Sequence, residues 1–283
     1  MALDTFKQVR EILSHDRNEK YFDKSKLDII RGFLKGVTVD EEIDSPVLNP
    51  VFHDYRDWIE WNLQTRLAAG GQRYEYHQKE QKLLGACKRH AESHQRPITA
   101  DKVLFLVHPF YLILSHMHHV ETDEMHMEIN EYIFKILSLF QKRSPENLGI
   151  VLLDTIHHYA AVSSLLLEKA HIDQVIFTLH DDGIPLVPNE LYQYKDRVVY
   201  IGGGYNCGKN NSGGCFVNTI DIARREIPNI IAVKDLTFNS PRHNEKRLKP
   251  TEIKKGQRNG FFHRKEIVDS TRLHVKDCIF RKN

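Results

Sequence analysis

Cys215 is the residue of this sequence best placed to act as a nucleophile. It follows Gly213-Gly214 and opens a segment, 215–226, whose apolar residues recur at helical spacing. A helix N-terminus lowers the pKa of a thiol and favours the reactive thiolate, and backbone N–H groups there could serve as an oxyanion hole. The pattern therefore predicts hydrolysis or group transfer at Cys215. The alternative is a buried structural cysteine at a helix start.

A cysteine nucleophile needs a base and a group that orients that base. His108, Asp154 and the pair His180-Asp181 each follow a short apolar run of the chain. The carboxyl ends of parallel strands meet at one edge of a sheet, so we expect these four residues to supply acid–base or orienting groups. Pro109 favours an extended backbone at His108. The alternative is that polar residues mark strand ends only because loops begin there.

A glycine-rich segment, GGGYNCGKNNSGG at 202–214, precedes Cys215 and holds six of the chain's 15 glycines. Between a strand and a helix, backbone N–H groups of such a loop can bind an anion. It resembles G-x-x-x-x-G-K, but Asn210 replaces the Ser or Thr that would hold magnesium, so we expect no phosphate loop of that type. The predicted ligand-binding residues are Gly203, Gly204, Tyr205, Asn206, Gly213 and Gly214, with Tyr111 and His157 from the same edge.

The run VVYIGGGYNCGKNNSGGCFVNTIDIARREIPNIIAVKDLT, residues 198–237, resembles one segment of the isochorismatase-like cysteine hydrolases. In that family a strand ends in a glycine-rich turn, the nucleophilic cysteine opens a helix, and the next strand ends in an Asp-containing turn. The resemblance gives Cys215 the nucleophile's position and implies a Rossmann-like α/β fold. His108 stands where that family has an Asp after its first strand.

The sequence is unusually rich in histidine, with 17 residues, and several lie in SHMHHVETDEMHME at 115–128. Histidine and carboxylate ligands suit zinc, manganese or iron, and His116, His118 and Asp123 are the candidate ligands. No H-E-x-x-H pattern occurs. The alternative is a polar loop that happens to contain many histidines. We therefore do not favour a divalent metal, and the sequence leaves the cofactor unknown.

These residues must be positioned by the segment 101–240, where short apolar runs alternate with helical periodicity. Continuous apolar strands separated by helices are typical of a parallel sheet covered on both faces. We predict an α/β domain with a doubly wound, mostly parallel, Rossmann-like sheet of about five strands. The strands are expected at 103–107, 148–153, 174–179, 197–201 and 229–233, and the helices at 124–142, 158–170 and 215–226.

The two ends of the chain differ from this segment. Residues 1–100 show helical periodicity and predict an α-helical N-terminal region. Residues 241–283 hold 13 Lys and Arg against five Asp and Glu, so they carry a net charge of +8 while the rest of the chain carries −6. We expect a partly ordered basic tail. An acidic protein or a nucleic acid is the kind of partner that such a tail suits.

Composition excludes several classes of protein. The 283 residues are 41% hydrophobic, no apolar run approaches the roughly 18 residues of a membrane span, and we see no signal peptide. Four cysteines are too few for a disulfide scaffold, so we expect a reduced, cytoplasmic protein. The sequence predicts a soluble hydrolase or group transferase acting on a small anionic molecule. The alternatives are a non-catalytic nucleotide-binding or protein-interaction module, and a metal-dependent hydrolase using 116–128.

Overall fold

The chain forms two compact units, Met1–His94 with Ile113–Glu121 and Ile156–Lys169 as unit 1, and Gln95–Leu112 with Thr122–Thr155 and Ala170–Asn283 as unit 2. The structure, a computed structural model, describes residues 47–53, 57, 73–110, 123–167, 172–179, 184–205, 215–239, 267–268 and 270–273. In this part of the chain no helix is both long and apolar enough to cross a membrane.

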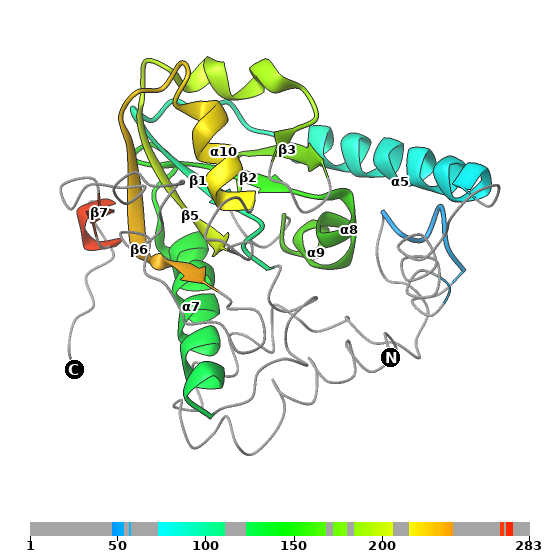
Figure 1. Ribbon diagram of the computed structural model, residues 1–283, viewed down its shortest axis with the longest axis horizontal. Coiled ribbons are helices and arrows are strands. Elements are labelled where there is room, and N and C mark those ends of the chain that lie inside the picture. Colours follow the sequence, from blue (N-terminus) through cyan, green and yellow to red (C-terminus); the bar gives the residue numbers. More distant parts are fainter. Residues whose placement is uncertain are drawn as a thin grey trace, which may run out of the picture. The chain divides into compact units, whose positions relative to one another are not determined.

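Unit 2 is built on one mixed, mostly parallel sheet (Figure 1). Within the described residues it has seven strands in the order β4-β3-β2-β1-β5-β6-β7, and only the β3–β4 pair is antiparallel. This confirms the predicted α/β class and adds two short edge strands to the five expected. The strands are β1 (Lys102–Val107), β2 (Gly149–Asp154), β3 (Gln174–Leu179), β4 (Ile184–Pro185), β5 (Val198–Tyr205), β6 (Ile230–Asn239) and β7 (Ile267–Val268).

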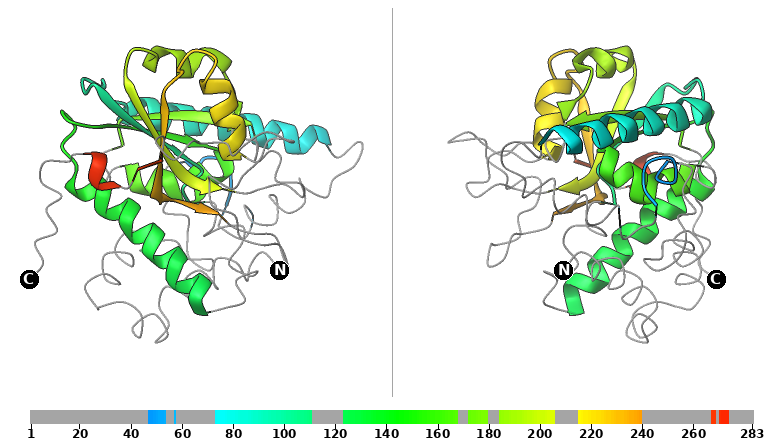
Figure 2. Two further views of the ribbon diagram at one scale, coloured as in Figure 1. Left: turned by 60° about the vertical axis from the view of Figure 1, so that its left-hand side comes forward. Right: turned by 90° about the vertical axis from the view of Figure 1, so that its right-hand side faces the viewer.

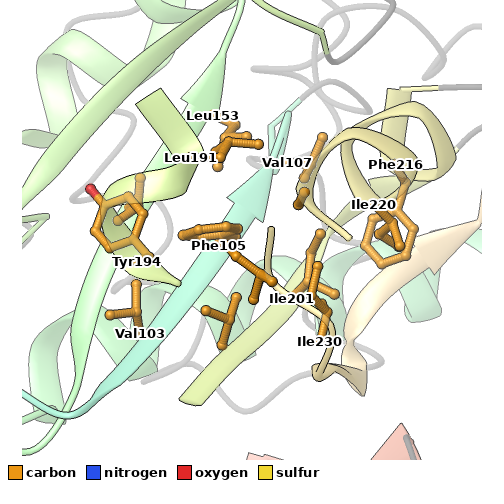
Figure 3. Packing of buried hydrophobic residues seen from close by; sticks show 14 of the residues in the cluster. Val103, Phe105, Val107, Leu153, Leu191, Tyr194, Ile201, Phe216, Ile220 and Ile230 are labelled. Carbon is orange, nitrogen blue, oxygen red and sulfur yellow. The ribbon is translucent and has the colours of Figure 1, made fainter. Parts of the chain in front are cut away.

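One face of the sheet packs on α10 (Cys215–Ala223) and on the 3-10 helix η4 (Pro188–Tyr194). Alternate residues of β1 point into this core, where the rings of Phe105 and Tyr194 meet edge to face at 5.2 Å (Figure 3). From α10, Phe216 and Ile220 complete it with no exposed surface. Such a closely packed core fixes where α10 begins relative to the ends of β1 and β5.

The opposite face packs on α7 (Asp123–Lys142), which joins β1 to β2. Right-handed crossovers that run in opposite directions along a sheet place their helices on opposite faces, and Figure 2 shows the strands between α7 and α10. The ring of Phe140 on α7 lies 6.4 Å from that of Phe110, and the ring of Tyr132 lies 5.7 Å from Phe238 on β6. These contacts bring Tyr132 to the end of the sheet where β1 stops.

A buried ion pair holds the C-terminal end of α7 to the beginnings of β2 and β3. Arg143 bonds Asp173 with two of its nitrogens, each at 2.9 Å, and donates to the carbonyl of Leu148 at 2.5 Å. Asp173 also accepts the N–H of Ile150 at 2.7 Å. Burial lowers the pKa of the Arg143 guanidinium, and the Asp173 carboxylate opposes that shift. The pair lies at the amino ends of the strands, so we assign it a structural role.

Unit 1 contains α5 (Arg73–His94) and a second helical segment made of α8 (Ile156–His158), the π-helix η2 (Tyr159–Ser163) and α9 (Ser164–Leu167). The predicted helix 158–170 is therefore interrupted by a π-turn. The two segments are linked where Nδ1 of His90 lies 2.7 Å from the hydroxyl of Tyr159 and where Cys87 Sγ donates to the carbonyl of Ile156 at 3.7 Å. Much of the predicted helical region 1–100 lies outside the described residues.

Part of the basic segment 241–283 packs on the sheet. Strand β7 pairs in parallel with β6, and the 3-10 helix η7 (Ser270–Leu273) follows it. Asp235 on β6 accepts the N–H of Ser270, the first residue of η7, at 2.7 Å and also accepts its hydroxyl. The remaining tail residues, for which the sequence predicts an acidic or nucleic-acid partner, lie outside the described residues.

Candidate active site

Three neighbouring strands of unit 2 reach the carboxyl edge of the sheet side by side. Val107 of β1 is in register with Leu153 of β2 and with Gly203 of β5. The next residues, His108, Asp154 and Gly204, therefore form a row across the carboxyl edge of these strands, which lie about 4.8 Å apart, and the His108 N–H bonds Leu153 O on the neighbouring strand. His108 and Asp154 are fully buried. The structure thus brings together two of the predicted acid–base residues.

Cys215 lies beside this row. It is the first residue of α10, its side chain is buried, and Sγ donates to the carbonyl oxygen of Gly204 at 3.5 Å. The chain passes from β1 to one side through β2 and β3, and to the other side through β5 and β6, so the strand order reverses between β1 and β5. In open α/β sheets this reversal, at the carboxyl ends, is where ligands bind.

His108 has a strained backbone. Its φ is 41°, in the left-handed region, so the extended geometry predicted from Pro109 is wrong. Such a conformation costs of the order of 1–3 kcal/mol in a non-glycine residue and is often found at functional sites. Two contacts hold the residue: its N–H donates to Leu153 O at 2.8 Å, and Nε2 lies 2.7 Å from Oγ1 of Thr178 on β3. The imidazole therefore reaches past the end of β2 to β3.

Gly203 and Gly204 belong to β5, not to a loop as predicted. The strand continues to Tyr205 because β6 also runs on, to Asn239, with a register shift where Ile201 pairs with Ala232 and Gly203 with Thr237. At Gly203 φ is 123°, and a Cβ there would lie 2.1 Å from Val107 O. Only glycine fits this position, because the backbones of β5 and β1 approach each other closely at Gly203 and Val107.

Gly203→Ala is expected to destabilise the fold by at least about 2 kcal/mol, because alanine is strained at this φ and its methyl group would overlap the backbone of β1. Urea unfolding measures the change. The matched control is Gly85→Ala in the middle of α5, where a Cβ meets only the flexible end of Arg89 at 3.3 Å. That change is expected to stabilise by about 0.4–1 kcal/mol. Equal effects at both positions would contradict the close approach.

Tyr132 is a member of the site that the sequence analysis missed. It is buried, and its hydroxyl donates to the carbonyl of Pro109 at 3.0 Å. Burial raises the pKa of the phenol well above its usual range, and the negative charges of Cys215 and Asp154 raise it further. The phenol therefore stays protonated and acts as a hydrogen-bond donor.

The sequence analysis also missed Thr178, although both Thr178 and Tyr132 occupy positions that can be recognised in the sequence. Thr178 is the polar residue within the apolar run QVIFTL, and Tyr132 precedes Ile133 on the buried face of the helix predicted at 124–142. A hydroxyl in a buried strand needs a partner, which here is His108. Periodicity alone assigns both residues to the core.

The other predicted site residues are placed as follows. Tyr205 ends β5 and Asp123 begins α7, but the structure does not describe the side chain of either. His157 belongs to α8 of unit 1. In the described part of the chain no three His, Cys, Asp or Glu side chains gather as a metal site. Outside the described residues lie His180, Asp181, Asn206, Gly213, Gly214, Tyr111, His116 and His118.

No family model, no curated protein and no solved structure matches this chain. The assignment of a function therefore depends on the geometry of unit 2 and on the chemistry of its side chains.

Proposed function

We propose that unit 2 is a hydrolase or group transferase with Cys215 as its nucleophile. The observation that carries the proposal is a contact at the carboxyl edge of the sheet. Cys215 Sγ donates to the carbonyl of Gly204, and Gly204 belongs to the row that also contains His108 and Asp154. Apart from the edge strands β4 and β7, the strand order is that of a doubly wound, Rossmann-like sheet, and the row lies at its reversal point. A buried cysteine, histidine and aspartate at such a place suit covalent catalysis.

The proposed steps use only these groups. In the resting state the Cys215 thiol donates to Gly204 O. Asp154 or His108 takes the thiol proton as Sγ attacks an electrophilic carbonyl carbon of the substrate, and the same group then protonates the leaving group. Water cleaves the resulting thioester in a hydrolase, and a second acceptor does so in a transferase. Backbone N–H groups at the start of α10 stabilise the oxyanion.

The proposed substrate is small and anionic. The site is built from buried residues at the edge of a sheet, so a small molecule fits it better than a polymer does. The N-terminus of α10 carries a partial positive charge and N–H groups without helical partners, which favour a carboxylate or phosphate on the substrate. The resemblance of 198–237 to the isochorismatase-like hydrolases supports the same chemistry.

Covalent capture tests the proposal. The purified chain is incubated with a panel of small ester, amide and nucleotide compounds that carry a carboxylate or phosphate, quenched in acid, and mapped by peptide mass spectrometry. We expect an acyl or other substrate-derived adduct on the peptide that contains Cys215. Turnover accompanied by adducts on another residue alone would contradict the proposal.

His108→Asn is expected to separate activity from stability. Asparagine tolerates the left-handed region, so relief of strain offsets the lost bond to Thr178 and the free energy of unfolding changes by less than about 1 kcal/mol. Activity falls by about 10²–10⁴-fold if the imidazole transfers a proton. The matched control is His158→Asn, at a buried histidine of unit 1, which leaves activity unchanged. A full-activity His108→Asn protein would exclude His108 from the mechanism.

A second candidate function is ligand binding without catalysis. It is favoured by one observation: the Cys215 thiol is buried and hydrogen-bonded to a carbonyl, as an unreactive structural cysteine would be. A binding module would retain its ligand in Cys215→Ser and would form no covalent adduct. Equilibrium dialysis of the same anionic compounds against both proteins distinguishes the two functions.

A further inference from the structure

Tyr132 contacts the site at the residue after His108. Its hydroxyl donates to Pro109 O at 3.0 Å, and its ring packs on Phe238 of β6, with ring centroids 5.7 Å apart. The side chain is 3% exposed, so the phenol is held between α7 and β6 with little freedom to move. Through Pro109 it restrains the segment in which His108 adopts its left-handed backbone.

His108 needs such a restraint. A left-handed residue before a proline is unfavourable both at its own φ and because of the proline that follows. The strand hydrogen bond from its N–H to Leu153 O fixes only the preceding peptide. The hydrogen bond between Nε2 and Thr178 Oγ1 forms only when the backbone of His108 directs the imidazole toward β3. The Tyr132 contact fixes the Pro109 carbonyl, which lies one peptide beyond the bond that joins His108 to Pro109.

We infer that Tyr132 is a positioning residue for the proposed reaction: by anchoring the Pro109 carbonyl, it holds His108 in the left-handed backbone that directs the imidazole along the row of strand ends. The inference rests on the proposed function, because that function gives His108 a catalytic role. Burial, and after it the negative charges of Cys215 and Asp154, raise the pKa of the phenol, so the hydroxyl stays protonated as the donor to Pro109 O.

The test compares Tyr132→Phe with Tyr194→Phe. Both remove one buried phenol hydroxyl, but Tyr194 bonds Gln174, the first residue of β3, at the end of the sheet away from the row. In the full-length protein with ¹⁵N-labelled histidine, the His108 ring signals are identified as those that vanish in His108→Asn. We expect them to shift or broaden in Tyr132→Phe and to stay at their wild-type positions in Tyr194→Phe. Unchanged His108 signals in a folded Tyr132→Phe protein would overturn the inference.

A double-mutant cycle covers the case in which Tyr132→Phe alone does not fold. Because asparagine relaxes the strain at position 108, Tyr132→Phe should lower the urea midpoint less in the His108→Asn background than in the wild type, or should fold only in that background. Equal losses in both backgrounds, or failure to fold in both, would overturn the inference. Neither readout depends on Cys215, so an active Cys215→Ser protein would remove the proposed function and leave the positioning result standing.

Discussion

Cys215→Ser lowers the turnover of the protein by about 10³-fold or more, which is the expected size for loss of a covalent nucleophile. A serine hydroxyl is far more difficult to deprotonate than a thiol, so the bases proposed for Cys215, Asp154 and His108, would activate it poorly. The substitution is nearly isosteric, so the fold and the hydrogen bond to Gly204 O are retained. The measurement is kcat/KM on whichever compound of the panel is turned over.

Cys87→Ser is the matched control for this experiment. Cys87 is also a buried cysteine whose thiol donates to a backbone carbonyl, that of Ile156 at 3.7 Å, but it lies in the middle of α5 in unit 1. We expect this variant to keep wild-type kcat/KM. If Cys215→Ser retains the activity of Cys87→Ser, the nucleophile assignment is wrong.

Asp173→Asn is expected to have the largest effect on stability, a loss of about 3–5 kcal/mol. Asp173 neutralises Arg143 and accepts the N–H of Ile150, and the side chains of this pair are 0% and 4% exposed for Arg143 and Asp173. An amide leaves the guanidinium charge buried without its counter-charge. A domain of this kind is stable by about 5–15 kcal/mol, so the loss is a large fraction of the total. Urea denaturation followed by circular dichroism measures it.

Glu131→Gln makes the same carboxylate-to-amide change in an ion pair that water screens. Glu131 and Lys135 pair at 2.9 Å along α7, with side chains 59% and 33% exposed. We expect a loss of about 0.2–0.5 kcal/mol there. Removing both charges of the buried pair, with Arg143→Met and Asp173→Leu together, is expected to cost less than Asp173→Asn alone. Similar losses for Asp173→Asn and Glu131→Gln would show that the buried pair is not structural.

The strands of the sheet were predictable because each is a continuous apolar run, as burial on both faces requires. The run KVLFLV became β1 and QVIFTL became β3 with their expected bounds or within one residue of them. The end of β5 was not predictable, because GGGY resembles a loop by composition. Only the backbone of β1, which leaves no room for a Cβ at Gly203, shows why glycines lie in that strand.

The candidate site was predictable to the extent that it depends on strand ends. His108, Asp154 and Cys215 each adjoin a boundary visible in the sequence, and parallel pairing brings those boundaries to one edge. Tyr132 and Thr178 were not, because they contribute through contacts between elements distant in sequence. The left-handed backbone of His108 also opposes the local preference set by Pro109, so only tertiary contacts account for it.

The reactivity of the Cys215 thiol as a nucleophile is tested by its rate of alkylation relative to that of Cys87. The native protein is treated with iodoacetamide near pH 7, samples are quenched over time, and each cysteine peptide is quantified by mass spectrometry. A thiol at a helix N-terminus forms thiolate more readily than one in mid-helix, so we predict that Cys215 reacts at least about tenfold faster than Cys87. Cys215 reacting no faster than Cys87 would contradict the assignment of Cys215 as a nucleophile.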